Sequence, residues 1–553
     1  MIRSHRSIRT CVAFVVAVLV TVAQSPATLT AQKARTTRNP TAAASPRTKA
    51  TRPTTRSRAS RTAARDATRA RGRTAKTRAV AARPVRRAPA IPLPTATSPV
   101  GVDALRADLS SMLGTGARSG SWSAMVVSLS AGDTLLSVTA DQPHLPASTM
   151  KLLTATLALD RLGANHRFRT ELLHTGTIRD GVLEGDLVLR GDGDPSLSTR
   201  FLGASPDAAM DSIAQLVVRR GVRRVTGRVI GDASAFEARA TPEGWLPRIL
   251  EDSYAGKVSA LSLNEGIVWV TVRPVGGRAQ VTLEPASVAL PISAAVRVTG
   301  GAGANLAVRR TGNTVVVRGS IGARAGQRAY GLVIPDPATF TTGALVAALQ
   351  RAGVETSGQW VVAPAPIGTT LLGALESQPV ETLVTVMNRQ SVNPIAEHLL
   401  RAAVRGPERS GVGTAVGAER MLQELLRREA GANPAAVQVR DGSGLSTLDR
   451  ISARAMVQML GWADRAPWRS LFHASLPLAG ESGTLRGRMR GTAAQANLHA
   501  KTGTTNDVVS LAGYVTARNG ELLAFALLYN GADRWRAKSA IDAVGVTLAD
   551  FTR

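Results

Sequence analysis

Residues 148–162 of the chain read STMKLLTATLALDRL. The large apolar side chains of this stretch fall on nearly all sides of a helix, and they are Met150, Leu152, Leu153, Leu157, Leu159 and Leu162. A helix that is apolar all round is buried in a protein core. Ser148 and Lys151 stand at its start, three residues apart and on one face, so the lysine amine can reach the serine hydroxyl.

This serine–lysine pair has a chemical interpretation and a simpler one. A serine hydroxyl is a poor nucleophile unless a base removes its proton. A lysine can be that base if burial and neighbouring cations lower its pKa, and a helix N-terminus adds partial positive charge where an oxyanion forms. Taken alone, Ser148 could equally be a helix cap and Lys151 a solvated helix residue.

Two further short motifs follow in the chain. Ser391-Val392-Asn393 precedes Pro394, which suits the first turn of a helix and would present Ser391 and Asn393 at a cleft. Lys501-Thr502-Gly503, followed by Thr504, precedes a hydrophobic strand whose backbone could pair with an extended peptide. Lys501 is also a candidate for the cation that lowers the pKa of Lys151. Individually, these motifs could be a helix cap and a turn before an edge strand.

The three motifs in this order resemble the S-x-x-K, S-x-N and K-T-G signature of penicillin-binding proteins and β-lactamases. From about residue 101 to the C-terminus the chain resembles the DacB-type D-Ala-D-Ala carboxypeptidases and endopeptidases. Three more segments carry the likeness: GDGDPSL at 191–197, VSALSLNE at 258–265 and DGSGLS at 441–446. The wide spacing between Ser148 and Ser391 also fits this family, which has inserted domains there.

The resemblance implies a fold class, a reaction and a role for each residue. The fold is α+β, a penicillin-binding/β-lactamase-like transpeptidase fold with inserted mainly-β domains. The substrate is a peptidoglycan stem peptide, β-lactam antibiotics are inhibitors, and no cofactor is needed. Ser148 is implied as the acylated nucleophile, Lys151 as its base and Ser391 as a proton shuttle. Asn393 is implied as a ligand of the substrate backbone, and the N–H groups of Ser148 and Thr504 as the oxyanion hole. The terminal carboxylate would be held by Lys501, Thr502 and Thr504, with Gly503 as a further substrate-binding residue.

One position departs from the family pattern. The family often continues D-G-S-G-L-S with arginine, but this chain has Thr447 there. That arginine is associated with recognising the acidic end of the peptide side chain, so this preference is in doubt. Arg450 stands three residues further on as a possible substitute.

The N-terminus resembles a targeting segment. Basic residues from Arg3 to Arg9 precede an apolar run from Cys11 to Ala23, and small residues then continue to Ala31. The run is shorter than the roughly 18 residues of a membrane-spanning helix. We therefore expect a cleaved signal peptide over 1–31 and export to the periplasm or cell envelope. Cys11 is the only cysteine, so the mature chain has no thiol for a disulfide, a nucleophile or a metal site.

Most of the net charge of +29 lies in one segment. Residues 33–87 hold 18 Lys and Arg against one acid, Asp66. With few apolar side chains, residues 32–100 are predicted to be a disordered basic linker. It could contact anionic envelope polymers electrostatically, or it could be a solvated spacer. Since residues 33–87 contain no aromatic side chain for base stacking, no nucleic-acid partner is expected.

The remaining chain is predicted to form one catalytic domain interrupted by an insertion. Residues 101–171 form its first part, 172–335 the inserted mainly-β domains and 336–553 its second part. Strands are expected at 122–129, 134–139, 508–515 and 522–529, the last two joined across Asn519-Gly520. Short β-type runs at 187–189, 225–230, 268–272, 281–283 and 315–317 mark the insertion, and helices are expected at 340–352, 380–388, 394–404 and 415–429.

Other functions fit the sequence less well. A β-lactamase needs a deacylating glutamate, and neither Glu171 nor Glu184 stands in a recognisable motif for one. A catalytically silent wall-binding protein of the same fold remains possible, although all three motifs are intact. The seven histidines show no H-x-x-x-H or H-x-H spacing, so no metal site is expected.

Overall fold

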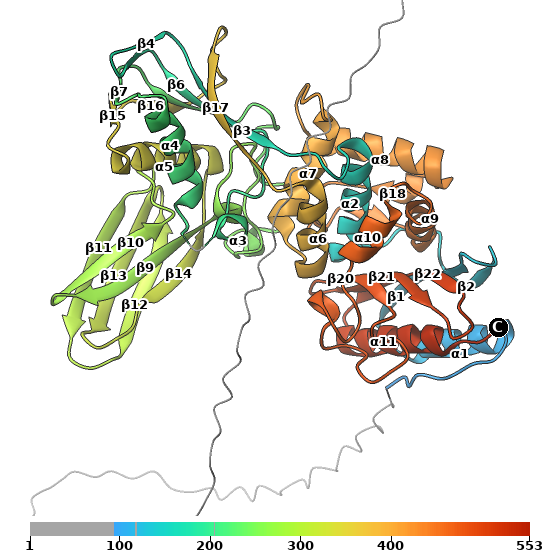
Figure 1. The fold of residues 1–553 in the computed structure, drawn as a ribbon. Helices are drawn as coiled ribbons and strands as arrows, with labels where there is room; N and C mark the ends of the chain where they lie inside the picture. Colours follow the sequence, from blue (N-terminus) through green and yellow to red (C-terminus); the bar gives the residue numbers. More distant parts are fainter. Residues whose placement is uncertain (1–92, 117–118, 204) are drawn as a thin grey trace, which may run out of the picture. The chain divides into compact units, whose positions relative to one another are not determined.

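The computed structural model describes residues 93–116, 119–203 and 205–553 (Figure 1). The predicted signal peptide and nearly all of the predicted basic linker lie outside the described residues. The last linker residues contact the folded body: Thr97 Oγ1 donates to Asp108 Oδ2 at 2.6 Å, and Pro99 O accepts from Thr552 N at 3.1 Å. In the described part of the chain, no helix has both the length and the apolar character needed to cross a bilayer.

One five-stranded antiparallel sheet organises the catalytic part, in the order β2-β1-β22-β21-β20. The strands are β1 (Gly120–Ser128), β2 (Thr134–Val138), β20 (His499–Thr504), β21 (Val508–Thr516) and β22 (Leu522–Gly531). Strands β21 and β22 are the predicted hairpin around Asn519-Gly520. Because β20 stands at the edge of the sheet, its outer side beyond the bridge between His499 and Leu478 is open to a further strand.

The two faces of the sheet cover two different hydrophobic cores. Because successive side chains of a strand point to opposite faces, alternate residues of β22 belong to different cores. Phe525 and Leu527 pack towards α1 (Val102–Gly116) and α11 (Arg534–Asp550), whereas Ala526 and Leu528 pack towards the other helices. Figure 1 shows α1 and α11 together beneath the sheet. Those other helices are α2 (Met150–Arg161), α6 (Val380–Gln390), α7 (Asn393–Arg405), α8 (Ala415–Ala430), α9 (Ala453–Ala463) and α10 (Arg469–Ser475).

The insertion begins and ends on two paired strands. In β3 (Arg169–His174) and β17 (Thr370–Glu376) the pairing is antiparallel, and Arg169 lies opposite Glu376. The ends of the inserted segment are therefore adjacent. Its core extends to Leu372 and includes α5 (Pro337–Arg351), which the sequence analysis assigned to the catalytic part from residue 336 onward.

Four small sheets and two longer helices build this insertion. The sheets have the orders β16-β8-β6-β3-β17, β15-β7-β5-β4, β10-β9-β14 and β11-β13-β12. The other elements are β4 (Thr177–Arg179), β5 (Val182–Glu184), β6 (Leu187–Arg190), α3 (Thr199–Leu202), α4 (Ala208–Arg219), β7 (Arg224–Val225), β8 (Val229–Asp232), β9 (Ile267–Val275), β10 (Arg278–Glu284), β11 (Ile292–Thr299), β12 (Ala304–Thr311), β13 (Thr314–Gly322), β14 (Arg328–Val333), β15 (Glu355–Thr356) and β16 (Trp360–Val362). A two-stranded pair, β18 (Val437–Gln438) and β19 (Arg450–Ile451), returns to the catalytic part.

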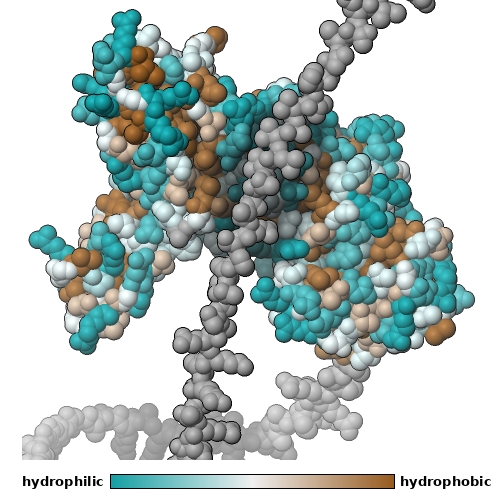
Figure 2. Space-filling model, viewed as in Figure 1, coloured by the Kyte–Doolittle hydropathy of each residue, from teal (hydrophilic) through white to brown (hydrophobic). Residues whose placement is uncertain are grey.

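The predicted α+β fold with a largely β insertion is confirmed, and most predicted strands and helices lie within a few residues of their expected positions. The run expected at 225–230 is an exception, because the chain leaves one sheet after β7 and enters another at β8. The helix predicted from residue 148 is α2, preceded by a 3₁₀ turn (Ala147–Thr149), and its residues from Met150 to Leu159 are buried. On the visible surface, hydrophilic side chains are interspersed with hydrophobic ones, and some hydrophobic side chains gather over the part that holds β16 and β17 (Figure 2).

Candidate active site

The Ser148 hydroxyl stands on the 3₁₀ turn that leads into α2. Neither Ser148 nor the N-cap residue Thr149 makes a side-chain capping hydrogen bond to the helix, so the simple capping interpretation does not hold. Ala147, just before the serine, has a positive φ of 46°, which is uncommon for a residue with a side chain. Gly444 packs on it so closely that a Cβ would lie 1.8 Å from Ala147 O. The backbone at the serine is thus held in one conformation by its surroundings.

The Lys151 ammonium is fully buried and has three hydrogen-bond acceptors. Its Nζ donates to Ser148 Oγ at 3.0 Å, to Asn393 Oδ1 at 2.6 Å and to Ser443 O at 2.8 Å. The first contact is the one expected from the i, i+3 spacing. The other two come from distant segments and fix the position of the amine beside the hydroxyl.

Burial lowers the pKa of Lys151 to about 8, against the opposing effect of the carboxylates of Asp441, Glu397 and Asp449. The neutral amine is therefore accessible near neutral pH. Burial, one of the two causes expected from the sequence, is thus the main one, whereas Lys501, the expected neighbouring cation, is not among the groups that shift this pKa.

Ser391 and Asn393 lie on the turn between α6 and α7. Ser391 adopts left-handed geometry with φ 59°, and Asn393 is the first residue of α7. Ser391 Oγ accepts from Lys501 Nζ at 2.9 Å, and the Asn393 amide accepts from Lys151 and donates to Tyr254 O at 2.8 Å. Both side chains therefore form hydrogen bonds with other segments of the cleft and do not cap the helix.

Lys501 forms a second serine–lysine pair opposite the first. Its Nζ donates to Ser391 Oγ and to Thr502 O, both at 2.9 Å. Burial lowers its pKa well below the usual value, and the charge on Lys151 lowers it further. Because the two amines are buried close together, having both charged at once is unfavourable.

Strand β20 brings the third motif against the nucleophile. A Cβ on Gly503 would lie 2.1 Å from Ser510 Oγ, 2.7 Å from Pro146 O and 3.0 Å from Ser148 N, so only glycine allows this approach. Thr502 Oγ1 donates to Thr484 Oγ1 at 2.8 Å.

Two cavities open at Ser148. One, of about 330 Å³, also contacts Asn393, Thr504, Thr447 and Arg248. The other, of about 310 Å³, is lined by Ser148, Ser391, Thr484, Arg488, Thr502, Thr504 and Lys538. The hydroxyls of this second cavity are suited to a carboxylate, and its two cations, Arg488 and Lys538, are both paired with Asp542. All eight predicted site residues thus lie on or directly behind one cleft.

Several residues of the site were not found from the sequence. Asp441 is buried and accepts from the backbone N–H groups of Ser443, Gly444 and Ser446, which shapes the loop whose Ser443 carbonyl binds Lys151. Trp245 Nε1 donates to the same carboxylate at 2.7 Å. The motif DGSGLS pointed to this loop, but Trp245 is almost 200 residues away and no local pattern marks it.

Thr447, which stands where the family often has arginine, lies beside the cleft. The Thr447 hydroxyl donates to Gly244 O at 3.0 Å, and Thr447 lines the larger cavity. Arg450 does not line this cavity, and its guanidinium donates to the carbonyls of Thr447 and Asp449. Arg248 is the cation that lines this cavity.

No glutamate of the described residues lines either cavity at Ser148. Glu171, one candidate for a deacylating base, is paired with Arg190 and Arg409, and Glu184 lies in β5 of the insertion. Among the described residues there is also no cluster of three or more His, Cys, Asp and Glu side chains that could hold a metal ion.

Fold and cleft together define the class: a penicillin-binding serine enzyme, with one serine–lysine pair at the start of a buried helix, a second across the cleft, and the edge strand β20 beside them.

Comparison with known proteins specifies the family. The chain belongs to the D-Ala-D-Ala carboxypeptidase 3 (S13) family, whose model matches residues 105–551. It is 35% identical to a D-alanyl-D-alanine carboxypeptidase of Actinomadura sp. (strain R39), over 81% of this chain and 85% of the relative. It is 24% identical to the D-alanyl-D-alanine carboxypeptidase DacB of Haemophilus influenzae, over 70% of this chain and 80% of the relative. The resemblance inferred from the sequence is confirmed, and the protein is a serine-type D-Ala-D-Ala carboxypeptidase.

Solved structures agree on the fold. The crystal structure of penicillin-binding protein 4 (dacB) from Haemophilus influenzae matches with a TM-score of 0.64 at 22% identity, covering 77% of this chain and 93% of that chain. The same protein has been crystallised in complex with a β-lactam, with a TM-score of 0.61.

Proposed function

We propose that Ser148 is the acylated nucleophile and that Lys151 is the base that accepts its proton. The observation that carries this assignment is the 3.0 Å contact between a fully buried lysine amine of lowered pKa and the serine hydroxyl. Ser148 Oγ attacks the carbonyl carbon of the penultimate D-Ala while Lys151 takes the hydroxyl proton. The C–N bond then breaks, D-Ala leaves as the protonated amine, and water hydrolyses the ester to release the shortened peptide.

The remaining site residues have roles on either side of this bond. Ser391, hydrogen-bonded to Lys501, passes a proton to the leaving nitrogen, and Asn393 binds the substrate backbone. Lys501, Thr502, Gly503 and Thr504 bind the terminal carboxylate, next to the cations of the second cavity. The N–H groups of Ser148 and Thr504 stabilise the oxyanion.

Release of D-Ala from a peptide ending in D-Ala-D-Ala tests this assignment. Ser148→Ala should remove turnover without changing the fold, because the nucleophile is lost. Ser539→Ala is the matched control, since that half-buried hydroxyl donates to Trp535 O in α11 and lines neither cavity at Ser148. Turnover by Ser148→Ala at a rate close to the wild type would refute the assignment.

We further infer that the substrate is the stem peptide of bacterial peptidoglycan, that crosslinked stems are also cut, and that the enzyme works in the periplasm or cell envelope. The carboxypeptidase family supports the substrate, and the predicted signal peptide supports export. Digestion of a crosslinked peptide dimer, followed by mass spectrometry, tests the endopeptidase action. A dimer that stays intact while a pentapeptide is trimmed would exclude it.

The basic linker remains a prediction. If it adheres to anionic envelope polymers, removal of residues 32–92 should reduce salt-sensitive retention on wall or membrane fractions and leave soluble-peptide turnover unchanged. Equal retention of the full-length and trimmed proteins would make the linker a spacer.

A further inference from the structure

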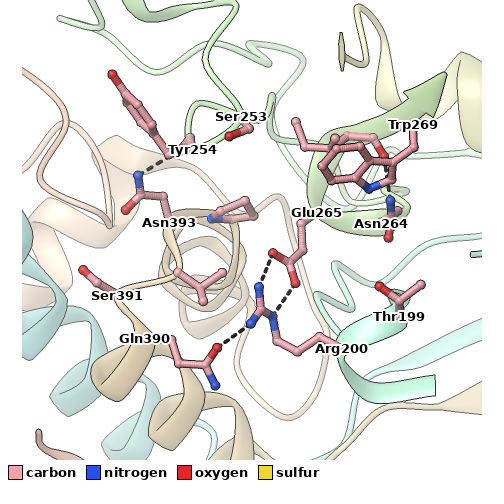
Figure 3. A pocket seen from close by; sticks show the side chains of 13 residues that line it. Thr199, Arg200, Ser253, Tyr254, Asn264, Glu265, Trp269, Gln390, Ser391 and Asn393 are labelled. Atoms are coloured by element: carbon pink, nitrogen blue, oxygen red, sulfur yellow. Dashed lines mark hydrogen bonds and ion pairs between the residues drawn. The ribbon is translucent and has the colours of Figure 1, made fainter. Parts of the chain in front are cut away.

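A separate cavity of about 520 Å³ adjoins the cleft. Its walls come from α3, the 3₁₀ turn Asn264–Gly266 and β9 of the insertion, and from the turn between α6 and α7 (Figure 3). It shares Tyr254, Ser391 and Asn393 with the larger cavity at Ser148. A group bound there is therefore contiguous with a substrate in the cleft.

An exposed indole forms one wall of this cavity. The side chain of Trp269, on β9, has 42% of its surface exposed, although β9 is the central strand of its sheet. Figure 3 shows the ring standing beside Asn264 on the cavity wall. Exposed indoles commonly bind the apolar face of a ligand while leaving its polar groups in water.

The polar wall carries no net charge. Arg200 donates to both carboxylate oxygens of Glu265, at 2.6 and 2.9 Å, and also to the side-chain carbonyl of Gln390 (Figure 3). The positive and negative charges are thus neutralised within the wall. What remains for a ligand is a set of amide and hydroxyl groups, including those of Gln390, Thr199 and Ser253.

The backbone of this wall is strained. Asn264 and Glu265 are consecutive residues with positive φ, 49° and 56°, and Ser391 on the opposite side has φ 59°. Side-chain-bearing residues rarely adopt this geometry, and such strain concentrates at ligand sites.

A ligand that matches these walls is uncharged, has one apolar face and has hydroxyl and amide groups on its rim. An N-acetylated amino sugar has this chemistry, whereas the free peptide strand of a crosslink carries charged amines and carboxylates. A stem peptide of five residues spans at most about 17 Å, so a sugar at its end stays close to the cleft. We propose that this cavity binds a sugar of the glycan strand to which the stem peptide is attached, an inference that rests on the proposed peptidoglycan substrate.

Turnover of a disaccharide-pentapeptide, relative to the same pentapeptide without sugar, tests the proposal. In the wild type the ratio of the two kcat/KM values should be about ten, the contribution of one well-formed aromatic contact. Trp269→Ala should reduce the ratio to about one, and Trp269→Phe should retain part of it, which guards against a misfolded variant. Trp535→Ala is the matched control, because this tryptophan is 77% exposed and lies outside the cavity.

An equal ratio in wild type and Trp269→Ala would overturn the proposal. So would a loss, in Trp269→Ala, of turnover on a sugar-free crosslinked dimer, since the cavity would then bind peptide. If neither pentapeptide is hydrolysed, the proposed function fails, and saturation-transfer NMR with the disaccharide alone still tests the cavity. A signal in the wild type that Trp269→Ala loses supports the sugar site, and its absence in the wild type contradicts it.

Discussion

At the scale of single residues, the site depends on two amines that are kept from water. The pKa of about 8 for Lys151 corresponds to about 3 kcal/mol in favour of the neutral form, relative to a solvated lysine. The carboxylates of Asp441 and Glu397 oppose this effect, so the amine can still take up a proton near neutral pH. A base of this kind works best when its pKa lies near the working pH.

Replacing Lys151 tests its role as base. Lys151→Ala should lower the rate of acylation by at least ~10²-fold, the low end of what a positioned general base contributes. Lys151→Arg should not rescue the rate, because a guanidinium does not give up its proton. The rate is measured with a fluorescent penicillin and the fold with circular dichroism. An Arg variant that acylates as fast as the wild type would show that Lys151 is not the base.

The pH dependence of acylation follows from the same pKa. Below pH 8 Lys151 is mostly protonated, so kcat/KM should rise about tenfold per pH unit between pH 6 and 7 and level off above about pH 8. Stopped-flow acylation between pH 5.5 and 10 measures the profile. A rate that keeps rising to pH 10 would mean that the controlling lysine has its ordinary pKa.

At the scale of elements, the strand β20 depends on one glycine. Gly503→Ala would place a methyl group against Pro146 O and Ser148 N, so β20 must move away from the nucleophile. A displacement of about 1 Å can cost ~10²-fold in rate, and we expect a loss of acylation of this size. Gly487→Ala is the control, because nothing lies within 4 Å of its Cβ. Similar acylation rates in the two variants would contradict the packing described for β20.

The elements that carry the motifs could be predicted because their signals are local. The helix after Ser148, which is apolar on nearly all sides, and the hydrophobic strands on either side of Asn519-Gly520 each show their structure within about fifteen residues. That the three motifs form one site was predicted only from the resemblance to a known family, because no local sequence pattern shows that Lys501 contacts Ser391. Trp245 and Arg248 were missed for the same reason, because they reach the cleft from the insertion.

At the scale of the whole molecule, the insertion contributes directly to the catalytic site. Trp245 binds the Asp441 carboxylate, Asp441 shapes the loop that holds Lys151, and the Tyr254 carbonyl accepts from Asn393. The end of the insertion was predicted at residue 335, but its core continues through α5 to β17. The apolar composition of α5 predicts a buried helix but does not show in which core it is buried, so the sequence alone could not place this boundary.

The contact between Trp245 and Asp441 offers a test of this coupling. Trp245→Phe removes one hydrogen bond to a buried carboxylate, a loss of about 1.5–3 kcal/mol in stability. We expect a lower melting temperature and slower acylation. Trp360→Phe, on β16 of the same insertion, should leave the acylation rate unchanged. Unchanged acylation in Trp245→Phe would show that the loop does not depend on the insertion.

The most direct test of the account is the residue that penicillin acylates. The full chain is treated with a labelled penicillin, digested and mapped by mass spectrometry. We predict one stable adduct, on Ser148, which disappears in Ser148→Ala and remains in Ser539→Ala. An adduct on another residue, such as Ser391, or no adduct at all, would contradict the assignment of Ser148 as nucleophile.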